Sequence, residues 1–213
     1  MHLTWLQNCV NNLVSLLLEL NPGLVPLRNE MTQCTRRCVI LRSPLGKIEI
    51  VGCETGIHEI RLEGKAEPQN GVEASISCEI CEATGEMTEP LKQCIAWLQA
   101  YFTEPQLMLK LPVPPFHHHL LEQASFTRDV LWTLLRDVKF GEAVSYKQLA
   151  ALAGHSKAAR AVGGAMRRNP VPIIIPCHRV ICSSGQPGNY TGGSHLKEWL
   201  LSHEKLQKEK LTY

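Results

Sequence analysis

Three residues with the means to do chemistry stand side by side in this chain: Cys177, His178 and Arg179. Thiolate is the nucleophilic form of cysteine, and an ordinary cysteine has a pKa near ~8.5, so a reactive cysteine needs a base or a positive charge beside it. His178 and Arg179 offer both. A cysteine drawn at random from the nine in the chain would more often be a small core residue. The neighbours of Cys177 instead indicate a nucleophile.

The elements that would position these residues begin with an apolar run, residues 173–175, which is typical of one short buried strand. Adjacent side chains of a strand point to opposite faces, so His178 could not touch Cys177 directly if the strand continued. Either the chain turns at Cys177 or a water molecule bridges the two groups.

Bulk composition favours a folded protein of one or two small domains. The chain has 213 residues, of which 44% are hydrophobic, so it can bury a sizeable core. Residues 1–117 carry 9 Lys and Arg against 13 Asp and Glu, whereas residues 118–213 carry 13 against 7, a net charge of +6. This asymmetry indicates a phosphate-binding face in the second half. The odd number of cysteines favours a reducing compartment with free or metal-bound thiols.

Residues 1–30 form an extension of unknown role. Leucines recur there at three- and four-residue steps until Asn21-Pro22-Gly23, which predicts a short amphipathic helix. The segment lacks the basic start and the uninterrupted apolar run of a signal peptide or membrane span, so we expect neither.

Residues 31–115 are expected to form a small α+β domain. Alternating apolar residues over 38–62, interrupted by two turn signals, predict an antiparallel meander. The acidic stretch 64–88 is typical of a surface loop, and 91–102 has the period of a helix that covers one sheet face. The prolines at 112, 114 and 115 then mark a linker.

Residues 116–213 are expected to form a mostly helical domain. Ser125 can cap one helix, and Ser145 with Gln148 forms a capping box for a second helix that Gly154 would end. Ser156 can cap a third helix, and the pair is a candidate helix-turn-helix. The predicted fold class is therefore α+β, with a small antiparallel sheet followed by a helical domain.

The last predicted helix begins near Ser194 and places Leu196, Leu200 and Glu204 on one stripe. A carboxylate on an apolar stripe has two interpretations. Either the stripe reaches solvent by Glu204, or Glu204 is buried and needs a partner.

The segment Pro176-Cys177-His178-Arg179-Val180, preceded by Asn169-Pro170-Val171-Pro172 and followed by residues 188–193, resembles the active-site signature of O6-alkylguanine-DNA alkyltransferases. Members of this family are DNA repair proteins that flip O6-alkylguanine out of duplex DNA and transfer the alkyl group irreversibly to their own cysteine, once per molecule. The resemblance implies that Cys177 is the acceptor. It also implies a chain from Glu204 through His178 and water to Cys177, and a proton-donating role for Tyr146 toward the leaving guanine.

The resemblance further implies that the partner is double-stranded DNA containing O6-alkylguanine, that the protein is a nuclear monomer, and that no membrane is involved. Arg160 would fill the space of the flipped nucleotide. His155, Lys147 and Arg168 depart from the usual family residues on the proposed DNA face. The implied substrate and DNA contacts are Thr127, Tyr146, Lys147, His155, Arg160, Asn169, Val180, Ser183, Tyr190 and Thr191.

A metal site is a further expectation. Cys34, Cys53, His58 and His117 could form a tetrahedral site by residue type, although their spacing matches no compact zinc finger. They correspond to the structural zinc ligands of animal members of the family, so the resemblance implies Zn2+ and no organic cofactor. Histidine also occurs at 118 and 119, so the ligand could shift by one from His117 to His118, and Cys78 with Cys81 is a rival pair that we interpret as incidental.

Two other classes of protein share parts of this pattern. A cysteine hydrolase would use Cys177 and His178 but would leave the arginine-bearing third helix without a task. A catalytically inactive sensor of alkylated DNA would share the fold and lack the nucleophile, which this chain has.

Overall fold

The computed structural model describes residues 34–63 and 77–211. These described residues belong to one compact unit. The helix predicted within residues 1–30 and the first part of the predicted surface loop lie outside the described residues. The predicted domain boundary at residue 115 stays a prediction.

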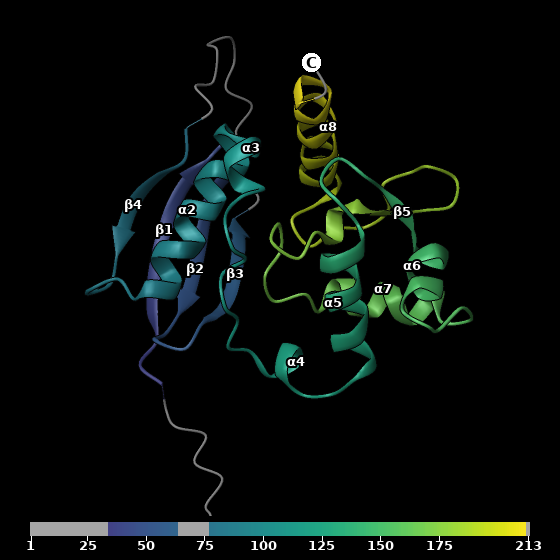
Figure 1. Cartoon of the computed structure of the whole chain (residues 1–213), viewed down its shortest axis with the longest axis horizontal. Helices are drawn as coiled ribbons and strands as arrows, with labels where there is room; N and C mark the ends of the chain where they lie inside the picture. Colours follow the sequence, from purple (N-terminus) through teal and green to yellow (C-terminus); the bar gives the residue numbers. More distant parts are fainter. Residues whose placement is uncertain (1–33, 64–76, 212–213) are drawn as a thin grey trace, which may run out of the picture. The chain divides into compact units, whose positions relative to one another are not determined.

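The sheet predicted for the first half is confirmed (Figure 1). Apolar residues at alternate positions, such as Val39 and Leu41 or Ile48 and Ile50, are buried and face the core. The sheet has the order β3-β2-β1-β4, and every neighbouring pair is antiparallel. Its strands are β1 (Arg37–Ser43), β2 (Gly46–Gly52), β3 (Ile57–Glu63) and β4 (Glu79–Ala83).

The prediction of a surface loop throughout residues 64–88 is wrong at β4, which is a strand. All its residues are exposed, so it lacks the apolar alternation that reveals a strand in a sequence, and it is held at the sheet edge by backbone pairing with β1. Cys78 is buried whereas Cys81 is exposed, and both lie outside the one metal-ligating cluster found in the described part of the chain. The pair therefore does not form a site.

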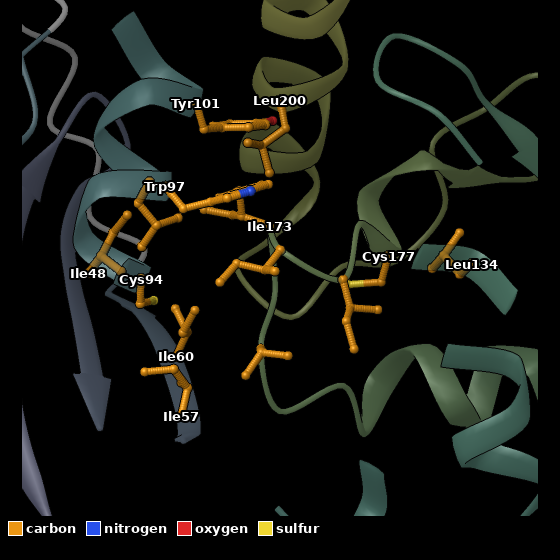
Figure 2. Packing of buried hydrophobic residues seen from close by; sticks show 14 of the residues in the cluster. Ile48, Ile57, Ile60, Cys94, Trp97, Tyr101, Leu134, Ile173, Cys177 and Leu200 are labelled. Atoms are coloured by element: carbon orange, nitrogen blue, oxygen red, sulfur yellow. The ribbon is translucent and has the colours of Figure 1, made fainter. Parts of the chain in front are cut away.

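Helix α2 (Glu89–Thr103) lies across one face of the sheet and is followed by the short α3 (Pro105–Met108) (Figure 1). In α2, the side chains of Leu91, Leu98 and Tyr101 are fully buried. Tyr101 also touches residues of the second half, so α2 belongs to a core shared by both halves (Figure 2).

The second half is mostly helical, as predicted. Two short strands pair in parallel beside the helices, which the sequence pattern did not reveal. Within the described ranges, no helix is both long and apolar enough to cross a membrane. The elements are α4 (His119–Glu122), α5 (Phe126–Asp137), β5 (Val144–Ser145), α6 (Tyr146–Leu152), α7 (Ala159–Arg167), the 3-10 turn η1 (Cys177–Arg179), β6 (Val180–Ile181) and α8 (Ser194–Leu211).

Two of the three predicted helix caps are confirmed. The Ser125 hydroxyl accepts from the N–H of Arg128, and Ser145 forms the expected capping box with Gln148. Gly154 follows α6 with φ of 79°, a conformation that favours glycine. The cap at Ser156 is wrong: α7 begins after Ala158, which has no side chain that could accept a hydrogen bond.

The predicted strand at residues 173–175 is also wrong. Pro170 and Pro172 have no N–H to donate, so the segment before Cys177 cannot form a regular ladder. The chain instead turns: Ile175 donates to the carbonyl of Val171, and Ile173 adopts φ of 74°, which is unusual for a β-branched residue. Ile173 is nevertheless fully buried in the core (Figure 2).

Candidate active site

Cys177 is the first residue of η1, and its side chain is 4% exposed. The chain therefore turns at the motif, which was one of the two alternatives left by the sequence. The side-chain amide of Asn169 reaches back across this loop. Its Nδ2 donates to the carbonyl of Ile175 at 2.8 Å and lies 3.1 Å from Sγ of Cys177.

His178 and Glu204 form a buried pair. Nε2 of His178 lies 2.6 Å from Oε1 of Glu204, and the two side chains are 0% and 1% exposed. A carboxylate can only accept, so Nε2 carries the hydrogen and Nδ1 of neutral His178 is the basic atom. Nδ1 is buried, and no hydrogen-bond partner reaches it within residues 34–63 and 77–211. Glu204 is thus the buried carboxylate with a partner, not the end of the apolar stripe.

Arg179 binds the same carboxylate from the other side of the turn. Its Nε donates to Oε2 of Glu204 at 2.8 Å, its Nη2 donates to Oε1 at 3.0 Å, and its Nη1 donates to the carbonyl of Val138 at 2.8 Å. Burial alone would raise the pKa of Glu204, but His178 and Arg179 outweigh it and hold the pKa well below its usual value. The carboxylate is therefore ionised beside His178.

The electrostatics keep both Cys177 and His178 uncharged at rest. Burial raises the pKa of the Cys177 thiol, although Asn169 and Lys197 oppose the rise. Burial also lowers the pKa of His178, and Glu204 only partly offsets this. A thiol in this state needs its proton removed before it can attack, and His178 is in the neutral form that a base requires.

A pocket of about 400 Å³ opens onto Cys177. Five residues expected at the site line it: Cys177, Tyr146, Arg160, Tyr190 and Thr191. Burial raises the pKa of Tyr146, so its hydroxyl keeps its proton and can donate. Gly188 and Asn189, from the signature segment 188–193, line the pocket as well, and four further lining residues were not expected from the sequence: Gly163, Met166, Arg167 and Cys182.

The other expected contacts lie outside the pocket lining. Lys147 and Ser183 are exposed, and the exposed His155 packs its ring against Phe126 at 5.1 Å. Thr127 is buried, and its hydroxyl accepts from Nη2 of Arg168 at 2.7 Å.

Lys197 on α8 is a site residue that the sequence analysis missed. It is 1% exposed, and its Nζ donates to the carbonyl of Val180 at 2.6 Å. The carbonyl of Val180 has a second lone pair, so it can still accept from a ligand. The helical period carried a signal, because Lys197, Leu200 and Glu204 are spaced i, i+3 and i+7 and so share one stripe.

The predicted metal ligands are brought together from three stretches of the chain, which hold Cys34, Cys53 with His58, and His117. The ligand atoms of Cys34, Cys53, His58 and His117 all lie within 4.8 Å of one another. Two sulfurs and two imidazole nitrogens suit a closed four-coordinate site, so the residues fit a zinc ion. His118 is not needed, because its Nδ1 accepts from the N–H of Leu120.

One thiol of the cluster, that of Cys53, has a lowered pKa. Burial by itself would raise the pKa of Cys53, but hydrogen bonds from His117, the N–H groups of Thr55 and Gly56, and His58 lower it to about 6. Gly56 also permits the close approach of the segment that carries His117. A Cβ at Gly56 would lie 2.7 Å from the carbonyl carbon of Phe116.

Two family models match the chain. The ribonuclease-like domain of 6-O-methylguanine DNA methyltransferase matches residues 37–115, and the DNA-binding domain of the same family matches residues 125–206. The chain belongs to the 6-O-methylguanine DNA methyltransferase family. The methylated-DNA--protein-cysteine methyltransferase of Homo sapiens is 58% identical over 173 residues, which cover 80% of this chain and 81% of that protein. The protein of that name from Rattus norvegicus is 59% identical over 173 residues, covering 80% and 83%.

Solved structures of the family have the same fold. The Mycobacterium tuberculosis OGT protein in complex with DNA is 27% identical with a TM-score of 0.59, covering 79% of this chain and 92% of that chain. The O6-methylguanine methyltransferase of the same organism is 29% identical with a TM-score of 0.59, covering 81% and 94%.

Proposed function

We propose that this methyltransferase repairs DNA by moving the alkyl group of an O6-alkylguanine, flipped out of the duplex, onto Cys177. The observation that carries the proposal is a buried thiol lining a pocket, with the ionised Glu204 and neutral His178 packed behind it. The family to which the chain belongs and the names of its relatives support the same reaction.

The reaction needs the thiol proton removed and the negative charge on the leaving guanine stabilised until water protonates it. His178 would take the thiol proton at Nδ1 through a bridging water, since Nδ1 is buried and available. Sγ then forms a bond to the alkyl carbon while the bond between that carbon and O6 breaks. The electron pair of the broken bond stays on O6 of guanine. Tyr146 would donate a hydrogen bond to the guanine as negative charge develops on it. Guanine leaves, and Cys177 carries a thioether.

Recognition of DNA would use the exposed cations around α6 and α7. Lys147, Arg160, Arg167 and Arg168 are all exposed there, and Arg160 and Arg167 also line the pocket mouth. Phosphate contacts by such side chains supply most of the affinity for DNA. Arg160 is the candidate to occupy the space that a flipped nucleotide leaves.

A structural Zn2+ held by Cys34, Cys53, His58 and His117 is also part of the proposal, because this donor set suits zinc and leaves no open position for catalysis. When bound, the ion would join the start of β1, the β2–β3 connection and the segment before α4. Its role would be to stabilise the fold. Action as a nuclear monomer stays a prediction from the sequence.

The test of the function is transfer of label from duplex DNA containing radiolabelled O6-methylguanine. The wild-type protein should become labelled on the peptide that holds Cys177, and Cys177→Ala should lose all transfer while its affinity for DNA changes less than about two-fold. The thiol contributes little to phosphate contacts, which is why binding should persist. Label on the alanine variant would move the acceptor elsewhere, with Cys182 first because it lines the same pocket.

A further inference from the structure

The carboxylate of Glu204 is shared by groups from three parts of the chain: η1, Gly141 and α2. Oε2 accepts from Nε of Arg179 and from the N–H of Gly141, at 2.8 and 2.9 Å. Oε1 accepts from Nη2 of Arg179 at 3.0 Å, from Nε2 of His178 at 2.6 Å, and from the hydroxyl of Tyr101 at 2.9 Å. Five donors thus meet one buried carboxylate that has about four lone-pair positions.

Tyr101 reaches this carboxylate from the first half of the chain. It lies on α2, the helix that packs on the sheet, and Figure 2 shows its ring extending from α2 toward α8. The ring is fully buried and held by neighbours on both sides, with Trp97 stacked at 5.6 Å and Phe140 edge-on at 5.9 Å. Burial raises the pKa of Tyr101 well above its usual value, so the hydroxyl keeps its proton and donates.

The donation has a consequence because Tyr101 and His178 use the same oxygen. Each hydrogen bond accepted by Oε1 withdraws part of the negative charge that would otherwise act on His178. We propose that Tyr101 is a positioning residue for alkyl transfer, whose hydroxyl shares Oε1 of Glu204 with His178 and so limits how firmly Glu204 holds His178 in its charged, inactive form. This inference rests on the proposed function, in which neutral His178 receives the thiol proton.

The charge balance at His178 depends on described residues from several elements. Glu204 favours the imidazolium, whereas Arg179 from the same turn and Lys197 from α8 oppose it. His203 packs against the Tyr101 ring at 5.4 Å, and Tyr190 faces His178 edge-on at 6.5 Å. Tyr101 is the residue that connects Glu204, and through it His178, to helix α2 and the sheet on which α2 packs.

Tyr101→Phe removes the hydroxyl and keeps the ring. More charge then remains on Oε1, the imidazolium form of His178 is stabilised, and the pKa of His178 rises. His178 reaches its neutral form only at higher pH, so the acidic limb of the rate of transfer from free O6-benzylguanine should move to higher pH by about 0.5 unit, a roughly three-fold loss of rate on that limb. The NMR titration of the His178 ring, assigned with a His178→Gln spectrum, should move by the same amount.

Gln99→Met is the matched control. Gln99 lies on the same helix, and its amide donates to the carbonyl of Cys78 at 2.9 Å, away from Glu204. This variant loses a side-chain hydrogen bond of α2 and should leave both the acidic limb and the His178 titration in place. A shift equal to that of Tyr101→Phe would mean that any disturbance of α2 has the effect, and would overturn the proposal.

Two further measurements separate a positioning role from a purely structural one. Replacing Tyr101 with 3-fluorotyrosine, a more acidic phenol and stronger donor, should move the His178 titration to lower pH. In a Glu204→Gln background, Tyr101→Phe should shift it by less than about 0.2 unit, because no carboxylate charge remains to be shared. The proposal fails if Tyr101→Phe lowers the rate equally at all pH values or leaves the titration unmoved. If wild-type protein does not alkylate Cys177 at all, the proposed function fails instead, and the His178 titration still reports on Tyr101.

Discussion

Nδ2 of Asn169 lies 3.1 Å from Sγ of Cys177, although the two residues are eight positions apart in a turning chain. The same amide closes the loop at both ends, because Nδ2 donates to the carbonyl of Ile175 and Oδ1 accepts from the N–H of Val171. Asn169 therefore fixes the thiol in space and provides a donor that favours the thiolate against the effect of burial.

Asn169→Ala should make the thiol less acidic. Loss of the donor raises the pKa of Cys177 further, so the pH at which the thiol begins to react rises, and transfer from free O6-benzylguanine at pH 7 should slow by about ten-fold, equivalent to ~1.4 kcal/mol. The pH dependence of transfer measures the shift. Thr103→Val, which removes an exposed hydrogen bond to Gln99 on α2, serves as the control and should behave as wild type. An unmoved profile in Asn169→Ala would show that the amide only holds the loop.

The elements predicted correctly are those whose local sequence pattern matches the burial or hydrogen bonding of the same residues in the structure. The alternation at Ile48 and Ile50 and the capping box at Ser145 are local signals, and the structure agrees with both. Strand β4 has no such signal because none of its residues is buried, and its pairing with β1 depends on a partner about 40 residues away in sequence. At Ile173 the strand preference of three isoleucines does not decide the structure, because Pro170 and Pro172 cannot donate to a ladder and the chain turns.

The site was predictable from local sequence for the adjacent residues Cys177 and His178. For Glu204 the helix stripe left burial or exposure open, and its role beside His178 came from the family resemblance. The role of Tyr101 could not be predicted from the sequence, since Tyr101 lies 103 residues before Glu204. A tyrosine in an apolar helix stripe is typical of an ordinary core residue. Lys197 was overlooked because lysines are rarely buried, although the helix stripe that it shares with Glu204 was visible in the sequence.

Arg160→Ala should slow repair of duplex DNA far more than reaction with the free base. Arg160 is exposed at the pocket mouth, where its proposed task is to stabilise the duplex after a base leaves the stack. We expect at least about a thirty-fold loss with duplex DNA and less than a two-fold change with O6-benzylguanine, which needs no extrusion. Lys147→Ala is the comparison, since loss of one phosphate contact should weaken duplex binding without a selective loss of transfer. Equal losses of Arg160→Ala on both substrates would remove the insertion role.

Removal of metal should lower stability more than chemistry. The ligands join segments that begin with Cys34 and end with His117, all distant in sequence from Cys177, and a closed site holds the fold without touching the pocket. Cys53→Ser, or a chelator, should lower Tm by about 5 °C or more while protein that remains folded still reacts with O6-benzylguanine at nearly the wild-type rate. Cys81→Ser is the control, because that exposed cysteine lies outside the cluster and should leave Tm unchanged. Protein purified without chelators that contains no zinc by elemental analysis would contradict the assignment.

Each molecule should act once. Transfer to Cys177 produces a thioether whose carbon is sp3, with no carbonyl for water to attack and only a poorly stabilised thiolate as leaving group. A hydrolase intermediate would instead be a thioester, which a histidine base and water can resolve. His178 has its Nε2 committed to Glu204 and would have Nδ1 as its only basic atom, which can take a proton but cannot make a thioether cleavable.

With methylated DNA in excess, label on the protein should therefore stop at one alkyl group per chain. Mass spectrometry should find this group on the peptide containing Cys177. Repair that continues beyond one equivalent, with Cys177 recovered unmodified, would assign the pocket to a turnover enzyme and exclude the alkyl-acceptor mechanism.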